Sequence, residues 1–236
     1  MRISCKIVAE VLSVLKDRVV PGITTIELEE LALLHIKKYK AVPAFKGYAG
    51  FPYALCCSPN ECVIHGMPNN KPLKDGDILS IDFGVLYDEF YGDAAVTIPV
   101  GTISSEAKEL MRATEDSLYL GINQAFAGAR LFDISHAVQD HVEKSGYSVV
   151  RDFVGHGIGK KLHEEPQVPN YGKPGRGIQL KPGMVLAIEP MVNRGGYAVR
   201  VLDDGWTAVT TDGSLSAHFE HTVAITKQGP DILTRL

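Results

Sequence analysis

Two segments of the chain repeat one pattern, in which a turn leads into an apolar run that ends in a carboxylate. Leu73–Asp82 has the sequence LKDGDILSID, and Leu180–Glu189 has the sequence LKPGMVLAIE. In both segments a glycine, Gly76 or Gly183, stands six residues before the acid. Because side chains alternate along a strand, this equal spacing predicts that the two acids occupy equivalent places at strand ends.

A second, weaker repeat adds two more acids. Asp93–Ile98 (DAAVTI) and Glu220–Ile225 (EHTVAI) both begin with a carboxylate that leads a β-branched run. If the two halves of the chain pack about a pseudo-twofold axis, all four carboxylates meet at one central place, where they repel strongly unless cations lie between them. Any one of these acids alone could be an ordinary turn residue. The paired spacing favours a cation site, because burying carboxylates without a cation is costly.

Among the eight histidines, His156 is the one that we expect to bind a cation. Glycines surround it in Gly155–Gly159 (GHGIG), and they allow the backbone to approach another group closely and to direct the ring inward. His65 and His163 are left open between a functional role and that of a core histidine with a backbone partner. The other histidines are expected to be structural, solvated or capping residues: His35, His136, His141, His218 and His221.

Four carboxylates and one imidazole form an oxygen-rich set of donors. Such a set suits two divalent ions bridged by carboxylate and water better than a sulfur-rich structural zinc site does. Manganese, iron, cobalt and zinc all fit these donors. Cys62 and His65 have a C-x-x-H spacing, but no second pair stands at the spacing of a zinc finger, so a zinc finger is disfavoured.

The segments that must position these residues predict a mixed α and β chain. Apolar periodicity and capping signals predict helices from near Met1 to before Pro21, from Thr24 to about Tyr39, from Ser105 to about Phe126 and from Asp133 to about Lys144. β-Branched and aromatic runs predict strands at Leu55–Ser58, Cys62–His65, Ile78–Phe83 and Asp93–Ile98, and again from Ser148 onward. Ser105 and Asp133 are the expected N-cap residues of the last two helices.

Length and composition favour one domain with a sizeable core. The 236 residues carry a net charge of −4 with the two signs interspersed, so no basic field indicates nucleic acid or an anionic membrane as a partner. Charged residues interrupt the N-terminal apolar stretch, which disfavours a signal peptide and a membrane span there. The four cysteines form no framework of evenly spaced pairs, which is typical of a reducing compartment. We therefore expect a cytoplasmic protein and a monomer.

Seven ordered motifs, in a match that runs from about Lys6 to the C-terminus, strongly resemble type I methionine aminopeptidases. They are Asn60–Pro68 (NECVIHGMP), Ser80–Gly84 (SIDFG), Tyr91–Ala95 (YGDAA), Gly155–Gly159 (GHGIG), His163–Pro166 (HEEP), Ala187–Met191 (AIEPM) and Phe219–Thr222 (FEHT). One such motif alone would be weak, but seven in order are specific. The resemblance implies a two-metal aminopeptidase that hydrolyses the bond after the N-terminal methionine of nascent proteins when the second residue is small. The ribosome is an expected place for this activity.

The resemblance also implies an α+β fold of the pita-bread type. In this fold a curved antiparallel sheet carries helices on its outer face, and a single domain, here residues 1–236, consists of two pseudo-symmetric halves, about 1–128 and 129–236. The repeat found above agrees with this expectation. Carried over by motif, the metal ligands are Asp82, Asp93, His156, Glu189 and Glu220. Asp93 and Glu220 would bridge two divalent ions, Asp82 would hold one ion, and His156 with Glu189 would hold the other.

Catalytic and substrate-binding roles follow from the same resemblance. Glu189 would transfer the proton, His163 would contact the scissile carbonyl oxygen, and His65 would lie beside the scissile nitrogen. The positions that match the family's methionine pocket are Tyr48, Phe51, Cys56, His65, Leu162, His163 and Trp206. Aromatic and sulfur residues near strands are equally often plain core. Leu162 departs from the aromatic residue expected before the HEEP histidine, so we expect the shape of the pocket to differ from the family's at this position.

Three alternatives stay open at this point. Creatinases and prolidases share the fold, but they usually carry an additional N-terminal domain. Type II methionine aminopeptidases usually carry a long insertion between the positions of Glu189 and Glu220. A catalytically inactive relative that binds peptides or RNA would have lost ligands, and this chain keeps all five. The chain also begins inside what is normally the family's first long helix, so we expect a slightly shortened leading edge.

Overall fold

The computed structural model describes residues 1–235. A pair of helices precedes each of two runs of antiparallel strands. The helices are α1 (Arg2–Lys16), α2 (Thr25–Lys37), α3 (Ser105–Ile122) and α4 (Leu131–Lys144), with a short 3-10 turn, η1, at Tyr48–Gly50. The strands of the first half are β1 (Val42–Pro43), β2 (Leu55–Pro59), β3 (Cys62–Ile64), β4 (Ile78–Tyr87) and β5 (Phe90–Pro99). The later strands are β6 (Ser148–Val149), β7 (Gly155–Gly157), β8 (Glu164–Val168), β9 (Val185–Ile188), β10 (Met191–Asn193), β11 (Val199–Val201), β12 (Ala208–Thr210), β13 (Ser216–His218), β14 (His221–Thr226) and β15 (Gly229–Ile232).

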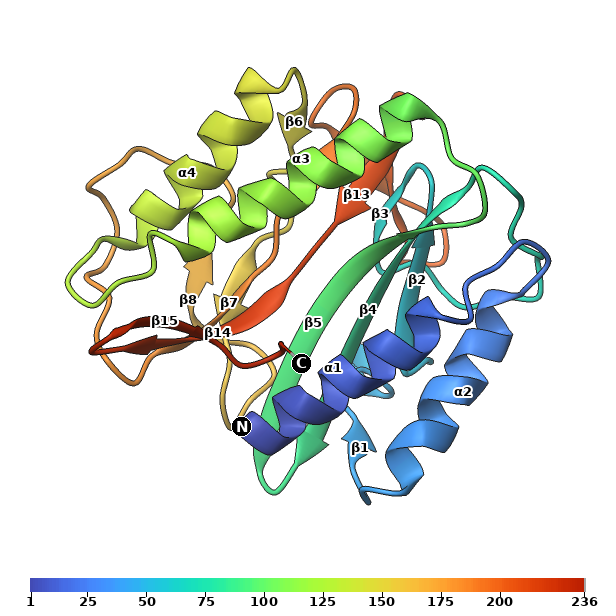
Figure 1. Ribbon diagram of the computed structural model, residues 1–236, viewed down its shortest axis with the longest axis horizontal. Helices are drawn as coiled ribbons and strands as arrows, with labels where there is room; N and C mark the ends of the chain where they lie inside the picture. The colour runs from blue at the N-terminus through green and yellow to red at the C-terminus, as the bar shows by residue number, and fades with distance from the viewer. Residues whose placement is uncertain (236) are drawn as a thin grey trace.

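The strands form four antiparallel sheets. One contains β1, β4 and β2 with β5 on the other side of β4, and another has the order β15-β14-β9-β7-β8. Two three-stranded sheets have the orders β13-β10-β6 and β11-β12-β3. The helices lie together on one side of these strands, with α3 beside α4, and the two ends of the chain lie close to each other (Figure 1). An ion pair between Arg2 and Asp231 joins the two ends.

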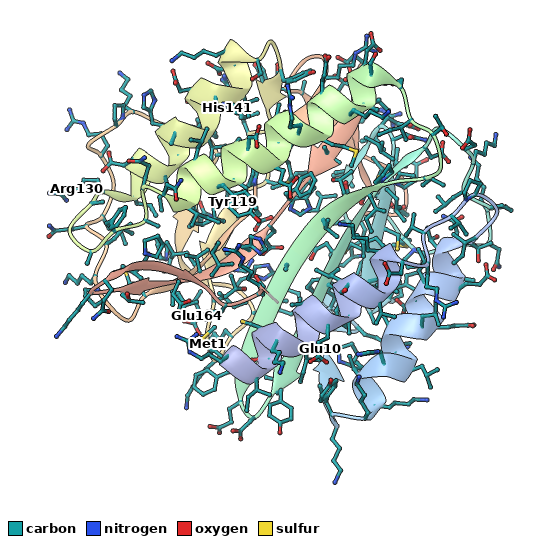
Figure 2. The ribbon with its side chains drawn as sticks, in the orientation of Figure 1. Met1, Glu10, Tyr119, Arg130, His141 and Glu164 are labelled. Atoms are coloured by element: carbon teal, nitrogen blue, oxygen red, sulfur yellow. The ribbon has the colours of Figure 1, made fainter. Side chains whose placement is uncertain are left out.

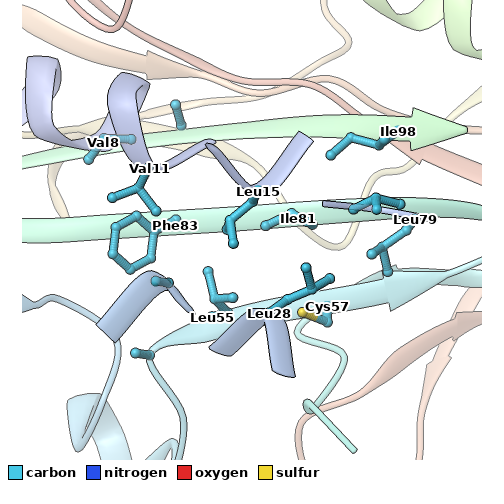
Figure 3. Close-up of a cluster of buried hydrophobic side chains, with 14 of the residues drawn as sticks. Val8, Val11, Leu15, Leu28, Leu55, Cys57, Leu79, Ile81, Phe83 and Ile98 are labelled. Carbon is cyan, nitrogen blue, oxygen red and sulfur yellow. The ribbon is translucent and has the colours of Figure 1, made fainter. Parts of the chain in front are cut away.

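Alternation along β4 sends apolar side chains to the helices and polar side chains to the other face. Leu79, Ile81 and Phe83 pack against α1 and α2 in a fully buried cluster (Figure 3). Because successive strand residues point to opposite faces, Ser80 and Asp82 must point away from that cluster. The apolar residues on each side of Asp82 therefore face the helices, and Asp82 itself lies on the opposite face of the sheet, which we call the inner face.

Local capping explains the helix starts, with two corrections. The expectation that Ser105 is the N-cap of α3 is wrong by one residue, because the N-cap is Ser104, whose hydroxyl accepts the backbone N–H of Ala107. Thr24 accepts the backbone N–H of Glu27 and the Glu27 carboxylate accepts the backbone N–H of Thr24, so the expected capping box of α2 is confirmed. The expectation that Asp133 is the N-cap of α4 is wrong. The N-cap is Arg130, and Asp133 lies three residues later, where its carboxylate accepts the backbone N–H of Arg130. An acid in the first turn thus does the capping from inside the helix.

The repeated glycines occupy the same backbone geometry. Gly76 has φ 96° and Gly183 has φ 95°, in the left-handed region that favours glycine. Gly76 donates its N–H to the carbonyl of Val100, just after β5, and Gly183 donates its N–H to the carbonyl of Ile225, near the end of β14. The similarity of the two turns, first visible as spacing in the sequence, is therefore a similarity of conformation and hydrogen bonding.

Two threonines join β5 to the strands that follow α4. Thr222 on β14 donates to the carbonyl of Asp93 (2.7 Å) and accepts its N–H (3.2 Å). Thr97 on β5 does the same for His218, at 2.8 Å and 2.9 Å. Along the part of the chain that is described, no helix is long and apolar enough to cross a membrane.

Candidate metal centre

Strand register places the first two acids side by side. In the β4–β5 hairpin Asp82 pairs with Ala95, and Gly84 pairs with Asp93. The two acids are therefore diagonal neighbours on one face of the hairpin. A Cβ on Gly84 would stand 3.2 Å from the Asp93 carboxylate, so the glycine leaves room beside it.

The other two acids meet in the same way at the far side of the site. Ile188 at the end of β9 pairs with His221 at the start of β14. The residues one step outward, Glu189 and Glu220, therefore face each other. Glu220 donates its N–H to the Ala95 carbonyl on β5 (2.9 Å), which fixes the second pair of acids against the first.

His156 is held between two strands with one ring nitrogen free. It pairs with Ala187 on one side and Gln167 on the other. A Cβ at the neighbouring Gly155 would lie 2.3 Å from the Ala187 carbonyl, so only glycine permits this close packing. The Nδ1 of His156 lies 2.9 Å from the Gly157 carbonyl. Because a carbonyl can only accept, Nδ1 carries the proton, and Nε2 keeps its lone pair for a ligand.

The side chains of these residues surround one small volume. Ligand atoms of Asp93, His156 and Glu220 all lie within 4.8 Å of one another. Oε1 of Glu189 lies 3.6 Å from Nε2 of His156. Asp82 lines the same cavity. The structure therefore brings together all five residues that the sequence motifs marked as ligands.

The electrostatics of the cluster fit a bound cation. Asp82, Asp93 and Glu220 each have a buried carboxylate oxygen without a hydrogen-bond partner in residues 1–235, and no lysine or arginine of those residues forms an ion pair with any of the acids. Burial raises the pKa of Asp82 to about 7. Burial and the neighbouring carboxylates raise the pKa values of Asp93 and Glu220 well above their ordinary range. Divalent cations among these oxygens would supply the missing partners and keep the acids ionised.

Burial also keeps His156 neutral, as a metal ligand must be. It lowers the pKa of His156 to about 4, with a further contribution from the neighbouring His163. The two rings lie edge to face with centroids 4.3 Å apart. A neutral imidazole with a free Nε2 is the form that coordinates borderline divalent ions.

Next to the acids lies a cavity of about 260 Å³ with a largely apolar wall. Phe51 packs edge to face on Trp206, with centroids 5.2 Å apart. The cavity is lined by every residue of the expected substrate pocket, namely Tyr48, Phe51, Cys56, His65, Leu162, His163 and Trp206. Four further lining residues, Phe45, Ile64, Phe153 and Val154, were not expected from the sequence. Ile64 lies in the motif Asn60–Pro68 but was given no role, and the other three lie outside the motifs, so only the fold brings them here.

His65 and His163 lie at different places around this cavity. His65 has φ 59°, an uncommon conformation for a residue other than glycine, and its ring contacts Phe153 and Trp206 edge to face. Burial lowers the pKa of His65 to about 4, so it is neutral near pH 7. His163 lies at the rim, and its Nδ1 is 2.7 Å from the Tyr48 hydroxyl. Neither ring is the core histidine with a backbone partner that was the alternative.

His218 does not fit the purely structural role expected for it. The side chain is buried, and its Nε2 lies 3.6 Å from Oε2 of Glu189 and has no hydrogen-bond partner among the residues described. Its spacing in the sequence could have indicated this position. Residues two apart on a strand share a face, and His218 stands two residues before Glu220. His218 is therefore a neighbour of the centre that the sequence interpretation missed.

His221 does fit a structural role. Its Nδ1 lies 2.9 Å from the Thr234 hydroxyl and its Nε2 lies 3.3 Å from the Tyr119 hydroxyl. Tyr119 projects from α3 toward the C-terminal strands (Figure 2). Both ring nitrogens are thus used on the helical side of the sheet, away from the acids.

Comparison with known proteins adds independent findings. The sequence model of metallopeptidase family M24 matches residues 1–227. A methionine aminopeptidase of Clostridium perfringens is 59% identical over 234 residues, covering 99% of this chain and 94% of that protein. The solved methionine aminopeptidase of Thermotoga maritima superposes with a TM-score of 0.99 at 51% identity, covering 100% of this chain and 95% of that one. A Xaa-Pro dipeptidase of Bacillus anthracis, with a TM-score of 0.80 at 21% identity over 100% of this chain and 59% of that one, shows a shared fold alone. The pita-bread α+β fold expected from the motifs is therefore confirmed.

Proposed function

Because the chain belongs to metallopeptidase family M24 and is a metallo-aminopeptidase, we propose that it hydrolyses the peptide bond after the N-terminal methionine of nascent polypeptides whose second residue is small. The single observation that carries this proposal is the cluster of four buried carboxylates and one neutral histidine beside an apolar cavity. Hydrolysis needs the charged centre, and selection of methionine needs the apolar cavity.

Two divalent ions would be held by the five clustered residues. Asp93 and Glu220, whose unpartnered oxygens face the centre, would be shared by both ions. Asp82 would hold one ion, and His156 with Glu189 would hold the other. When bound, such ions lower the pKa of a water molecule toward neutrality and polarise the scissile carbonyl. Manganese, iron, cobalt and zinc all suit this mixture of oxygen and nitrogen donors.

The chain's own residues would move the proton and orient the substrate. Burial raises the pKa of Glu189 well above its ordinary value in the metal-free protein. With ions bound, this carboxylate would take a proton from the attacking water and give it to the leaving amine. His163 at the rim would donate from Nε2 to the scissile carbonyl oxygen. The neutral His65 would accept a hydrogen bond from the scissile nitrogen or donate one to it, as the protonation of that nitrogen changes.

Substrate selection would come from the size of the cavity and from its apolar, polarisable lining. The cavity of about 260 Å³ includes the space among the acids, and its apolar part, lined by aromatic residues, Leu162 and Cys56, suits one flexible thioether side chain. Leu162 in place of an aromatic residue keeps this part of the pocket wall apolar. We place this activity on nascent polypeptides in the cytoplasm, consistent with four cysteines that are all free thiols, and we propose that the enzyme acts as a monomer.

Peptide hydrolysis by the purified protein tests the proposal. Protein reconstituted with manganese or cobalt is expected to release methionine from Met-Gly and Met-Ala peptides and to spare Met-Arg and Met-Lys peptides. Control peptides with leucine in place of the first methionine should be cut much more slowly. Preferential cleavage of X-Pro dipeptides, or no release with any divalent ion, would contradict the proposal.

A further inference from the structure

Tyr48 makes one contact that a pocket wall does not require. Its hydroxyl lies 2.7 Å from Nδ1 of His163, and the two rings are tilted with centroids 5.0 Å apart. The residues are 115 positions apart in the chain, so the bond reaches across the cavity from the first half to the second. It is a side-chain hydrogen bond at the rim, and the His163 ring also packs edge to face on the ring of His156.

A tightly bonded loop holds Tyr48 in place. The Gly47 N–H donates to the Phe51 carbonyl (2.7 Å), and the Phe51 N–H donates back to the Tyr48 carbonyl (2.9 Å). Ala49, the next residue, has φ 48°, which is uncommon for a residue with a Cβ. Phe51 is 3% exposed and packs on Trp206, whereas Tyr48 is 41% exposed. The loop is thus anchored by Phe51, and the more exposed Tyr48 presents its hydroxyl to His163.

The direction of this hydrogen bond follows from the two partners. A phenol is a better donor than acceptor, and the unprotonated nitrogen of a neutral imidazole is a stronger acceptor than a phenol oxygen. The most favourable pairing has the Tyr48 hydroxyl donating to Nδ1. A neutral ring carries one proton, so an acceptor at Nδ1 leaves the N–H at Nε2.

We propose that Tyr48 is a positioning residue that fixes the tautomer and the orientation of His163. With Nδ1 occupied by the Tyr48 hydroxyl, the Nε2–H of His163 is available to donate to the carbonyl oxygen of the bond being cleaved. This inference rests on the proposed function for the role of His163, while the tautomer itself is a property of the protein alone. Tyr48 acts through His163 and touches no reacting atom in this account.

Replacement of the hydroxyl alone gives the first test. Tyr48→Phe keeps the ring against the cavity and removes the donor. In manganese-loaded enzyme we expect kcat for a Met-Gly peptide to fall about tenfold, the loss of one hydrogen bond that matters in the transition state, with KM within about twofold of the wild type. Tyr53→Phe is the matched control, because Tyr53 contacts Phe51 in the same region but does not line the cavity.

A double-mutant cycle separates positioning from a pocket role. If Tyr48 acts through His163, Tyr48→Phe has no further effect on kcat in a His163→Ala background. A loss of the same size in both backgrounds would mean that Tyr48 contributes to the pocket independently, and it would overturn the proposal.

Nuclear magnetic resonance reads the tautomer without any activity measurement. Long-range proton–nitrogen correlation spectra of zinc-loaded protein, which is diamagnetic, should show His163 with Nε2 protonated and Nδ1 bare, assigned by comparison with His163→Ala. In Tyr48→Phe the same ring should show averaged or reversed nitrogen shifts. Unchanged His163 shifts in that variant would overturn the proposal even if kcat fell. If the wild type released no methionine from any peptide, the proposed function would fail, and these spectra would still decide whether Tyr48 fixes the ring.

Discussion

At the scale of single residues, the centre is a place where function and stability conflict. Burial raises the pKa of Asp82 from 3.8 to about 7, because the folded protein disfavours its charged form. The folded state therefore binds a proton at Asp82 more tightly than the unfolded state does. The contribution to stability is fully present below pH 3.8 and is lost as the pH rises through about 7.

Asp82→Asn is predicted to stabilise the metal-free protein and to inactivate the enzyme. Asparagine has nearly the same shape and never ionises, so urea unfolding of chelator-treated proteins should show the variant on the order of 2–4 kcal/mol more stable at pH 8 and nearly equal to the wild type at pH 4. Peptide hydrolysis with manganese should fall at least about a hundredfold, since one ligand is lost. A variant less stable than the wild type at pH 8 without metal would mean that protein groups, and not cations, satisfy Asp82.

Single residues differ in how well the sequence predicts them. The four acids were found from two repeats, because a strand turns equal spacing into equal placement. His156 was found from its flanking glycines. His218 was misassigned because its contact with Glu189 joins β13 to the residue after β9, and that long-range contact leaves no local pattern beyond the two-residue spacing from Glu220.

At the scale of elements, the centre depends on how closely β7 packs between β8 and β9. The strand has only three residues, Gly155–Gly157, yet it holds His156. Added methyl groups at either glycine would stand 2.3 Å from a backbone carbonyl, that of Ala187 for Gly155 and that of Glu165 for Gly157. Backbone cannot give way as a flexible side chain can.

Gly155→Ala is predicted to displace β7 from β9. The cost should be about 1–3 kcal/mol or more in urea unfolding, and manganese affinity measured by calorimetry should fall because His156 moves with the strand. Gly159→Ala is the matched control in the same motif. Its new methyl would meet only the Glu164 carboxylate, at 2.9 Å, and that side chain can rotate away. Equal losses in the two variants would show that the packing of β7 is not what positions His156.

Element boundaries were predicted well where capping and alternation are local. The capping box at Thr24 and Glu27 fixed the start of α2, and alternation fixed the face of Asp82 on β4. The start of α4 was placed too late, because an acid that caps from inside the first turn looks like an N-cap in the sequence. The short strands β6 and β10–β13 have too few residues for periodicity to define them.

At the scale of the whole molecule, hydrogen bonds from two threonines join β5 to the strands that follow α4. Thr222 binds both backbone groups of Asp93, and Thr97 binds both backbone groups of His218. The sequence predicted two halves from the repeat, about 1–128 and 129–236. It could not predict which residues join them, since threonines in β-branched runs are common.

Thr222→Val is predicted to loosen the junction between the halves. Valine keeps the shape but leaves the N–H and carbonyl of Asp93 without partners, at a cost of about 1–3 kcal/mol, and manganese affinity should fall with it. Thr226→Val, on the same strand, is the control, because Thr226 bonds only within its own turn, to Gly229 and Gln228. If both variants were equally mild in thermal unfolding and in metal titration, the junction would not depend on Thr222.

Anomalous scattering from crystals of manganese-loaded protein tests the central claim most directly. We predict two manganese peaks in the inner cavity, both bound by Asp93 and Glu220, one also by Asp82 and the other also by His156 and Glu189. Peaks elsewhere in the molecule, or no bound manganese among these five side chains at concentrations that support peptide hydrolysis, would contradict the account.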